Sequence, residues 1–288
     1  MSEPQRRDRA ALFPVASRNR WLGERLLRMR FMRRAVRRFM PGETLADALG
    51  SAVPLQAAGI GTMYTRLGEN LENLAAGDEV ATHYLGAIDQ MVAAGIDGEF
   101  SVKPTQLGLD HDPEACLAHL VRLAEHAAAA GSYLWVDMEG SACVEATISL
   151  YERLRAVQPR TGICLQAYLR RTAADIERLR PLAPAIRLVK GAYEEPESIA
   201  YRSQRSIDAN FLGLPVRFLL DGRDRPIRLG LGTHDVILIE QIAEQVAAAG
   251  IGRESFEIEM LYGIRDDQQY RLAAAGYRVL ALIASGDH

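Results

Sequence analysis

Two lysines, the only ones in a chain of 288 residues, lie where a run of apolar residues gives way to polar ones. Lys103 stands in FSVKPTQLG and Lys190 in RLVKGAY, whereas every other basic side chain among the 34 is an arginine. An ammonium is a compact charge on an amine whose pKa can be tuned, while a guanidinium is planar and permanently charged. Lysine at these two positions therefore predicts a site that needs an ammonium or an amine.

Further polar residues close similar apolar runs: Arg66, Glu69, Asp137, Glu139, Gln166, Arg187, Thr233, His234, Asp235, Glu259 and Tyr262. Three chemistries are compatible with them. A Schiff-base lyase would use Lys190 as its nucleophile. A metal hydrolase would combine His234 with carboxylates, but a single histidine in the set disfavours metal binding, and we expect no metal. Asp235 is more simply explained as a helix N-cap. A phosphorylated cofactor would use the cations to neutralise its phosphates.

The third chemistry has support from neutral residues. Gly191 in KGA has no side chain, so the backbone there could approach a cofactor closely. Gln166 and Thr233 offer hydrogen bonds of the kind that the edge of a flavin ring requires. Spacing alone leaves both a flavin and a sugar phosphate open.

The elements that must position these residues form one repeated unit, a β-rich run followed by a loop and an amphipathic helix. Eight such runs occur from residue 61 onward: GTMYTRLGE, EFSVKPTQLG, YLWVDMEGS, GICLQAYLR, IRLVKGAY, PIRLGLGTHD, FEIEMLYG and YRVLALIASG. Between them, residues 78–95 place apolar side chains at helical spacing, which predicts one buried face: Val80, Leu85, Ile88, Met91 and Val92. Helical stretches end in Gly95, Gly131, Gly250 and Gly276, as expected for left-handed C-terminal caps.

Eight strand–helix units predict an α/β fold, a closed (β/α)8 TIM-type barrel, because such barrels take about 250 residues. Continuously apolar strands are typical of a parallel sheet covered on both faces. An open doubly wound sheet would carry a G-x-G-x-x-G turn after its first strand. GIGTMY and GLGTHD both lack the third glycine. Because the carboxyl ends of barrel strands share one rim, we expect the polar residues to meet at one mouth.

Composition limits the partners and the compartment. A net charge of −3 gives no general attraction to nucleic acid, and we expect none as a partner. Three cysteines at scattered positions favour reduced thiols and a cytoplasmic location. The sequence contains no run of roughly 18 apolar residues, so we predict no membrane-spanning helix.

The first 40 residues contain twelve arginines interleaved with apolar side chains, as in RLLRMRFMRRAVRRFM. This pattern predicts a basic amphipathic helical arm over residues 1–50, followed by the barrel over 51–288. A solvated arm packed on the barrel is the simpler interpretation. Peripheral contact with anionic lipid at the inner face of the membrane is the alternative.

Six ordered motifs resemble the proline dehydrogenase family: SVKPTQLGLD, VDMEGS, LQAYLRRT, RLVKGAYEEP, GTHD and FEIEMLYGIR. The resemblance covers roughly residues 59–286 and points to the monofunctional bacterial type. It implies a distorted (β/α)8 barrel that binds FAD at its strand ends. The implied reaction oxidises L-proline to Δ1-pyrroline-5-carboxylate, the first step of proline degradation, and passes electrons to a quinone.

The resemblance also implies roles for individual residues. Lys103 is expected beside the substrate carboxylate and Asp137 near the substrate amine. Arg187 is expected to hydrogen-bond the flavin at its reactive nitrogen. The remaining contacts with FAD are expected from Met138, Gln166, Lys190, Gly191, Ala192, Thr233 and His234.

One feature of the family has no counterpart in the sequence. The family carries an arginine pair, which grips the proline carboxylate, on a helix after the last strand, whereas here only Asp287 and His288 follow Gly286. We therefore expect the last helix of the barrel to be missing. An FAD-binding barrel with impaired or no proline turnover is the alternative function.

Overall fold

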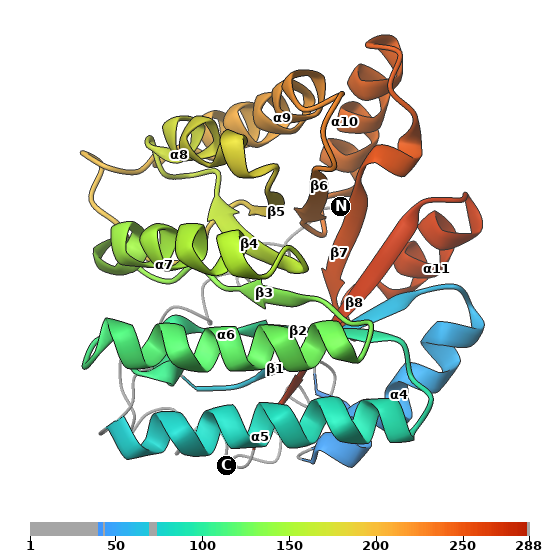
Figure 1. Ribbon diagram of the computed structural model, residues 1–288. Helices are drawn as coiled ribbons and strands as arrows, with labels where there is room; N and C mark the ends of the chain where they lie inside the picture. Colours follow the sequence, from blue (N-terminus) through green and yellow to red (C-terminus); the bar gives the residue numbers. More distant parts are fainter. Residues whose placement is uncertain (1–39, 43, 69–73, 287–288) are drawn as a thin grey trace, which may run out of the picture.

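The computed structural model describes residues 40–42, 44–68 and 74–286, which form a closed barrel of parallel strands in chain order (Figure 1). The strands are β1 Gly61–Arg66, β2 Gly98–Val102, β3 Leu134–Val136, β4 Thr161–Gln166, β5 Ala185–Val189, β6 Arg228–Gly232, β7 Glu257–Leu261 and β8 Arg278–Ser285. Strand β8 pairs with β1 from Gly61 opposite Leu280 to Arg66 opposite Ser285, which closes the cylinder. Each predicted run coincides with one strand to within one residue at the strand's start, so the predicted barrel is confirmed.

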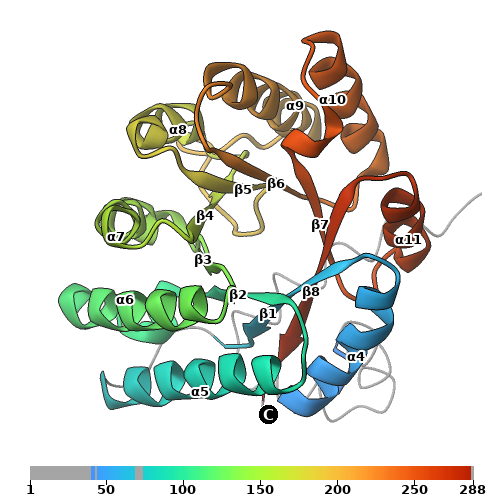
Figure 2. The same cartoon turned by 45° about the vertical axis from the view of Figure 1, so that its right-hand side comes forward.

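Helices surround the barrel on its outside, and each of the first seven strands is followed by one of them (Figure 2). Those helices are α5 Leu74–Ala93, α6 Pro113–Ala129, α7 Val144–Val157, α8 Thr172–Leu179, α9 Gln204–Asp221, α10 Val236–Ala248 and α11 Asp266–Ala274. Short 3-10 turns occur at η1 Pro104–Leu107, η2 Ser141–Cys143, η3 Arg180–Leu182 and η4 Arg253–Ser255. The glycines predicted to cap helices all have positive φ, at 65° for Gly95, 75° for Gly131, 70° for Gly250 and 86° for Gly276.

Helix α4, Leu45–Ala57, precedes β1 and covers β1 and β8 on the outside of the barrel. In both ribbon views it lies between α11 and α5, the place that a helix after β8 would take (Figures 1 and 2). Its N-terminus is fixed by a capping box between Thr44 and Asp47. The predicted boundary between residues 50 and 51 falls inside this helix, while residues 1–39 of the predicted arm lie outside the described residues.

The buried face of α5 differs from its prediction at one end. Val80, Ile88 and Met91 are buried and Leu85 is partly buried, but Val92 is 52% exposed, so its prediction was wrong. Val92 lies one turn after Ile88 and so on the same side of the helix, but it stands in the last turn of α5, where its side chain stays exposed. Tyr84 takes part in the buried face instead.

The interior of the barrel contains a small apolar layer made of Met63, Trp135, Ala185 and Leu280. Gly162 on β4 makes room for the Trp135 ring, since a Cβ there would lie 2.4 Å from a ring carbon. Protein interiors are packed densely enough that such an overlap has to be avoided by a residue without a side chain. The layer separates a charged cluster at one end of the barrel from the mouth at the other.

That charged cluster, called here the floor cluster, consists of Glu99, Arg228, Glu257 and Arg278 at the amino ends of their strands. The Arg228 guanidinium lies 2.7 Å from Glu99 Oε1 and 2.7 Å from Glu257 Oε1. Arg278 lies 3.3 Å from Glu99 and 3.0 Å from Glu257. Burial raises the pKa of Glu257 to about 7, although Arg228 opposes the shift. The positive and negative charges of the floor cluster thus nearly cancel, and each of its side chains is held in place by ion pairs with the others.

None of the helices in the described parts of the chain combines the length and the apolar character that crossing a membrane requires.

Candidate active site

The residues predicted to do chemistry follow or end parallel strands, so the fold brings them to one rim, the mouth of the barrel. Lys103 follows β2, and Asp137 with Met138 follows β3. Gln166 is the last residue of β4. Arg187 lies inside β5, and three more residues come directly after that strand: Lys190, Gly191 and Ala192. Thr233 and His234 follow β6. The mouth therefore collects cations, carboxylates and neutral hydrogen-bonding groups in one place.

Arg187 is a buried charge at the mouth, with its side chain 5% exposed. One terminal nitrogen donates to Ser101 Oγ at 2.6 Å and to Asp137 Oδ1, and the other donates to Glu259 Oε2 at 3.2 Å and to the sulfur of Met63 at 2.6 Å. Burial alone would lower the pKa of the guanidinium, but Asp137 and Glu259 outweigh it and hold the pKa above its ordinary value. Arg187 is therefore a fixed positive charge.

Ser101 links the two charged residues, since its hydroxyl accepts from Arg187 and donates to Asp137 Oδ1 at 2.8 Å. Sequence reasoning missed this serine. Side chains alternate along a strand, so a residue two positions before Lys103, such as Ser101, points to the same face. That alternation is the signal that could have found it.

Lys190 is held by two carboxylates, with its ammonium 2.7 Å from Asp208 Oδ1 and 3.0 Å from Asp235 Oδ2. Asp235 is also the N-cap of α10, as predicted, because its side chain accepts from the backbone N–H of Leu238. Burial raises the pKa of Asp235, but the ammonium and the helix backbone more than offset this and lower it. Asp208 comes from α9, away from any strand end, and no motif in the sequence marked it.

Lys103 lies at another part of the mouth. Its ammonium donates to the carbonyl of Gly68 at 3.3 Å, and that carbonyl also accepts from Gln106 Nε2 at 2.6 Å. Gly68 follows β1, so Lys103 lies on the β1–β2 side of the rim and Lys190 on the β5–β6 side. The two lysines therefore carry positive charge on different sides of the mouth.

Neutral groups complete the mouth. Gln166 donates to the carbonyl of Met138 at 3.4 Å, and its buried Oε1 has no hydrogen-bond partner within the described residues. His234 Nε2 accepts from the N–H of Leu261 at 2.9 Å, while burial and the charge of Arg265 lower the histidine pKa. His234 is therefore neutral near pH 7. A buried amide oxygen without a partner fits a hydrogen-bonding ligand.

At Gly191 the sequence predicted that the missing side chain lets the backbone approach a cofactor, but the structure gives a different reason. The φ of Gly191 is +118°, and a Cβ at this position would lie 2.1 Å from the ring of Tyr168. The space beside Gly191 is thus taken by a tyrosine of the protein. The glycine shapes the loop that carries Lys190, and whether its backbone also approaches a cofactor stays a prediction.

Replacing Gly191 by alanine is expected to reduce the free energy of unfolding by about 1–3 kcal/mol, because the methyl group meets the Tyr168 ring at a strained φ. Urea unfolding monitored by circular dichroism measures the change. Gly213→Ala is the matched control, since Gly213 lies in α9 with open space around it. The control should be neutral or slightly stabilising. Equal stability of the two variants would contradict this account of Gly191.

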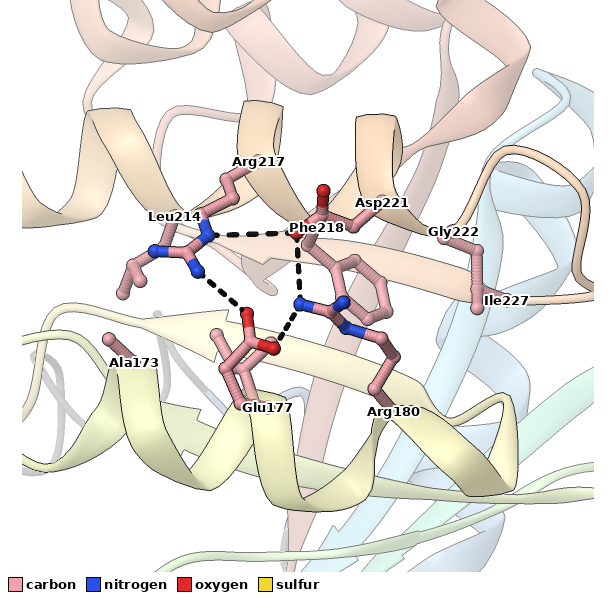
Figure 3. A pocket seen from close by; sticks show the side chains of 10 residues that line it. Ala173, Glu177, Arg180, Leu214, Arg217, Phe218, Asp221, Gly222 and Ile227 are labelled. Carbon is pink, nitrogen blue, oxygen red and sulfur yellow. Dashed lines mark hydrogen bonds and ion pairs between the residues drawn. The ribbon is translucent and has the colours of Figure 1, made fainter.

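A surface groove between α8 and α9 is a second place to consider (Figure 3). Four charged side chains line it, and they pair with one another: Arg180 with Glu177 and with Asp221 at 3.1 Å, and Arg217 with Glu177 at 3.0 Å and Asp221 at 3.6 Å. Two positive and two negative charges cancel. No predicted site residue lines the groove, so the mouth of the barrel is the better candidate.

The fold and the mouth together define a (β/α)8-barrel enzyme with the donor set for a phosphorylated, hydrogen-bonding cofactor. The sequence profile of the proline dehydrogenase family matches residues 48–288. The chain belongs to the proline dehydrogenase family.

Relatives support this assignment. Proline dehydrogenase 1 of Bacillus subtilis subsp. natto is 34% identical over 254 residues, which cover 88% of this chain and 83% of the relative. Proline dehydrogenase of Deinococcus radiodurans is also 34% identical over 254 residues, with 86% and 81% covered. Among solved structures, proline utilization A (PutA) from Bdellovibrio bacteriovorus superimposes with a TM-score of 0.81 at 21% identity. The match covers 89% of this chain but 31% of that much longer protein, and it concerns the fold alone.

The family assignment selects among the three chemistries that the residues had left open. The chain is an FAD-dependent oxidoreductase that acts on proline, in the first step of proline catabolism. The cations, the orphaned Gln166 oxygen and the neutral His234 fit that cofactor. The Schiff-base lyase and the metal hydrolase are thereby set aside.

Proposed function

We propose that the mouth of the barrel binds FAD and L-proline side by side, with Arg187 and Asp137 at the reacting centre and a quinone as the final electron acceptor. The observation that supports this most strongly is the buried contact between Arg187 and Asp137, which joins the cation assigned to the flavin and the carboxylate assigned to the substrate. FAD, when bound, supplies the hydride acceptor.

Each side chain then has a task that its charge suits. Arg187 offers a permanent positive charge where negative charge develops on reduction of the cofactor. Asp137 pairs with the proline nitrogen and orients the ring. Lys103 pairs with the proline carboxylate, for which a compact ammonium is suited.

Other residues of the mouth hold the cofactor. Gln166 and Thr233 give neutral hydrogen bonds, and Met138, Gly191 and Ala192 contribute surface beside them. Lys190 would bind a phosphate by sharing its ammonium with Asp208 and Asp235. His234 gives a hydrogen bond without adding charge, because its lowered pKa keeps the ring neutral.

Replacing Lys103 by methionine is expected to raise KM for proline about 10- to 100-fold and to change kcat much less. A charge-assisted hydrogen bond contributes about 1.5–3 kcal/mol, and Lys103 is assigned to binding rather than to the reacting atoms. Steady-state kinetics with an artificial electron acceptor measures both constants. Arg223→Met, which removes a surface cation, is the control. A fall in kcat at unchanged KM would contradict the assigned role of Lys103.

The quinone can be tested in a separate half-reaction. Protein reduced anaerobically by proline is mixed with a soluble benzoquinone or, in parallel, with an equal concentration of dissolved oxygen. We expect the flavin absorbance to return faster with the quinone. If the flavin absorbance returns equally fast or more slowly with the quinone, the quinone is excluded as the preferred acceptor. The proposed oxidation of proline would still stand.

The basic N-terminal arm, which lies outside the described residues apart from its last part, is proposed to bring the enzyme to the cytoplasmic face of the membrane, where quinones dissolve. Arginines interleaved with apolar residues favour binding to anionic lipid. Sedimentation with anionic and with neutral vesicles tests this, using full-length protein and the full-length variant R33Q/R34Q/R37Q/R38Q. Binding that is independent of lipid charge, or unchanged in the variant, would refute it.

A further inference from the structure

Arg187 has a second carboxylate partner that the assignment of the reacting centre does not use. Glu259 on β7 lies inside the barrel with its side chain 4% exposed, and its Oε2 accepts from Arg187 at 3.2 Å. The other oxygen, Oε1, has no hydrogen-bond partner within the described residues. Burial raises the pKa of Glu259, and the guanidinium opposes this shift. A buried carboxylate so placed is tied to the cation beside it.

Gly230 on β6 provides the space for this carboxylate. A Cβ at Gly230 would lie 1.9 Å from Glu259 Oε1, so any side chain there would displace the carboxylate. The glycine has no positive φ that would explain it otherwise. Glu259 and Gly230 therefore form a matched pair across the neighbouring strands β6 and β7.

The two carboxylates that hold Arg187 differ in their surroundings. The Asp137 side chain is 19% exposed and lies at the rim, whereas Glu259 is enclosed. Asp137 is also the group assigned to the proline nitrogen, so it has to share its charge with the substrate. If Asp137 were the sole carboxylate holding Arg187, substrate binding would loosen the guanidinium at the moment when its position matters.

We propose that Glu259 is the positioning residue of Arg187, holding the guanidinium in place while Asp137 engages the substrate, with Gly230 making room for it. This inference rests on the proposed function of the mouth. The floor cluster also acts on Glu259, since Glu99 raises its pKa, Arg228 on the neighbouring β6 lowers it, and Glu259 in turn raises the pKa of Glu257. None of these three floor-cluster residues is among the hydrogen-bond partners of Arg187 described above. The direct contact with Arg187 carries the proposed role.

The test compares two variants of the complete FAD-loaded protein, Glu259→Gln and Glu259→Leu. Both remove the charge and have similar size, but the amide oxygen of glutamine can still accept from Arg187 and leucine cannot. We expect flavin reduction by proline in E259Q to stay within about threefold of wild type and in E259L to fall about 10- to 100-fold, with KM for proline changed little. Such a fall corresponds to the loss of one hydrogen bond to a charged group.

The midpoint potential of the bound FAD gives a readout that does not depend on turnover. A displaced guanidinium stabilises reduced flavin less, so the potential of E259L should be more negative than that of E259Q. Dithionite titration against a reference dye measures it. Asp175→Asn, which removes a buried carboxylate on α8 that pairs with Arg171, is the control and should leave rate and potential close to wild type.

The outcomes separate the inference from the proposed function. Equal rates and equal potentials for E259L and E259Q would overturn the role of Glu259. If proline fails to reduce even the wild-type protein, the proposed function fails. The midpoint potentials of E259L and E259Q would in that case still test the role of Glu259. If E259L does not fold, Gly230→Ala replaces it: an added methyl group that leaves the rate and the potential unchanged would likewise overturn the proposal.

Discussion

Replacing Arg187 by methionine is expected to slow the reduction of bound FAD by L-proline about 100- to 1,000-fold. Removing one preorganised charge or donor aimed at the place where negative charge develops has an effect of this order. Arg187 is buried, permanently charged and held by Asp137, Ser101 and Glu259, so no other side chain or water can take its place readily. Anaerobic stopped-flow mixing, followed at the flavin absorbance, measures the rate.

Arg187→Lys is the informative companion. A lysine keeps the charge, but its compact ammonium lacks the planar fork of donors with which the guanidinium reaches Asp137, Ser101 and Glu259 at once. We expect this variant to lie between wild type and R187M. A reduction rate of R187M within threefold of wild type, in protein shown to carry FAD, would refute the assignment of Arg187 to the reacting centre.

Replacing Arg228 by methionine is expected to lower the free energy of unfolding by about 3–5 kcal/mol. Removal of one partner from a buried ion pair leaves poorly compensated charge, and here Glu99 and Glu257 would lose the buried cation that they share and keep only the exposed Arg278. The reduction rate of any protein that stays folded should change little, because the apolar layer around Trp135 separates the floor cluster from the mouth. Urea unfolding measures the stability.

Arg278→Met is the matched control for this prediction. Arg278 contacts the same two carboxylates, but its side chain is 59% exposed, so water screens the loss, and the expected effect is below about 1 kcal/mol. If R228M and R278M destabilise the protein equally, burial is not what makes the floor cluster important.

The barrel itself could be predicted because its signal is local and repeated. Each of the first seven strands is followed by its own helix, four of these helices end at a left-handed glycine, and eight such strands close only in a few ways. Parallel strands then place all their carboxyl ends at one rim, which brought Lys103, Asp137 and Arg187 to one mouth before any coordinate was known. The resemblance to proline dehydrogenases added the cofactor and the substrate.

The remaining features depend on packing between distant elements. The partners of Lys190 include Asp208 from the second turn of α9, and the space beside Gly191 belongs to Tyr168. Neither relation follows from spacing along the chain. Helix α4 covers β8 although it comes before β1 in sequence. The prediction for Val92 failed because helical spacing gives the side of a helix that packs on the barrel but not how far along the helix the buried face extends.

The most direct test of the account is the reaction of the FAD-loaded protein with L-proline in the absence of oxygen. The account predicts that the yellow flavin absorbance bleaches when proline is added and does not bleach with the same concentration of glycine. Absorbance that persists with proline but is lost with dithionite would show a flavin-binding barrel without proline turnover, and it would contradict the central claim.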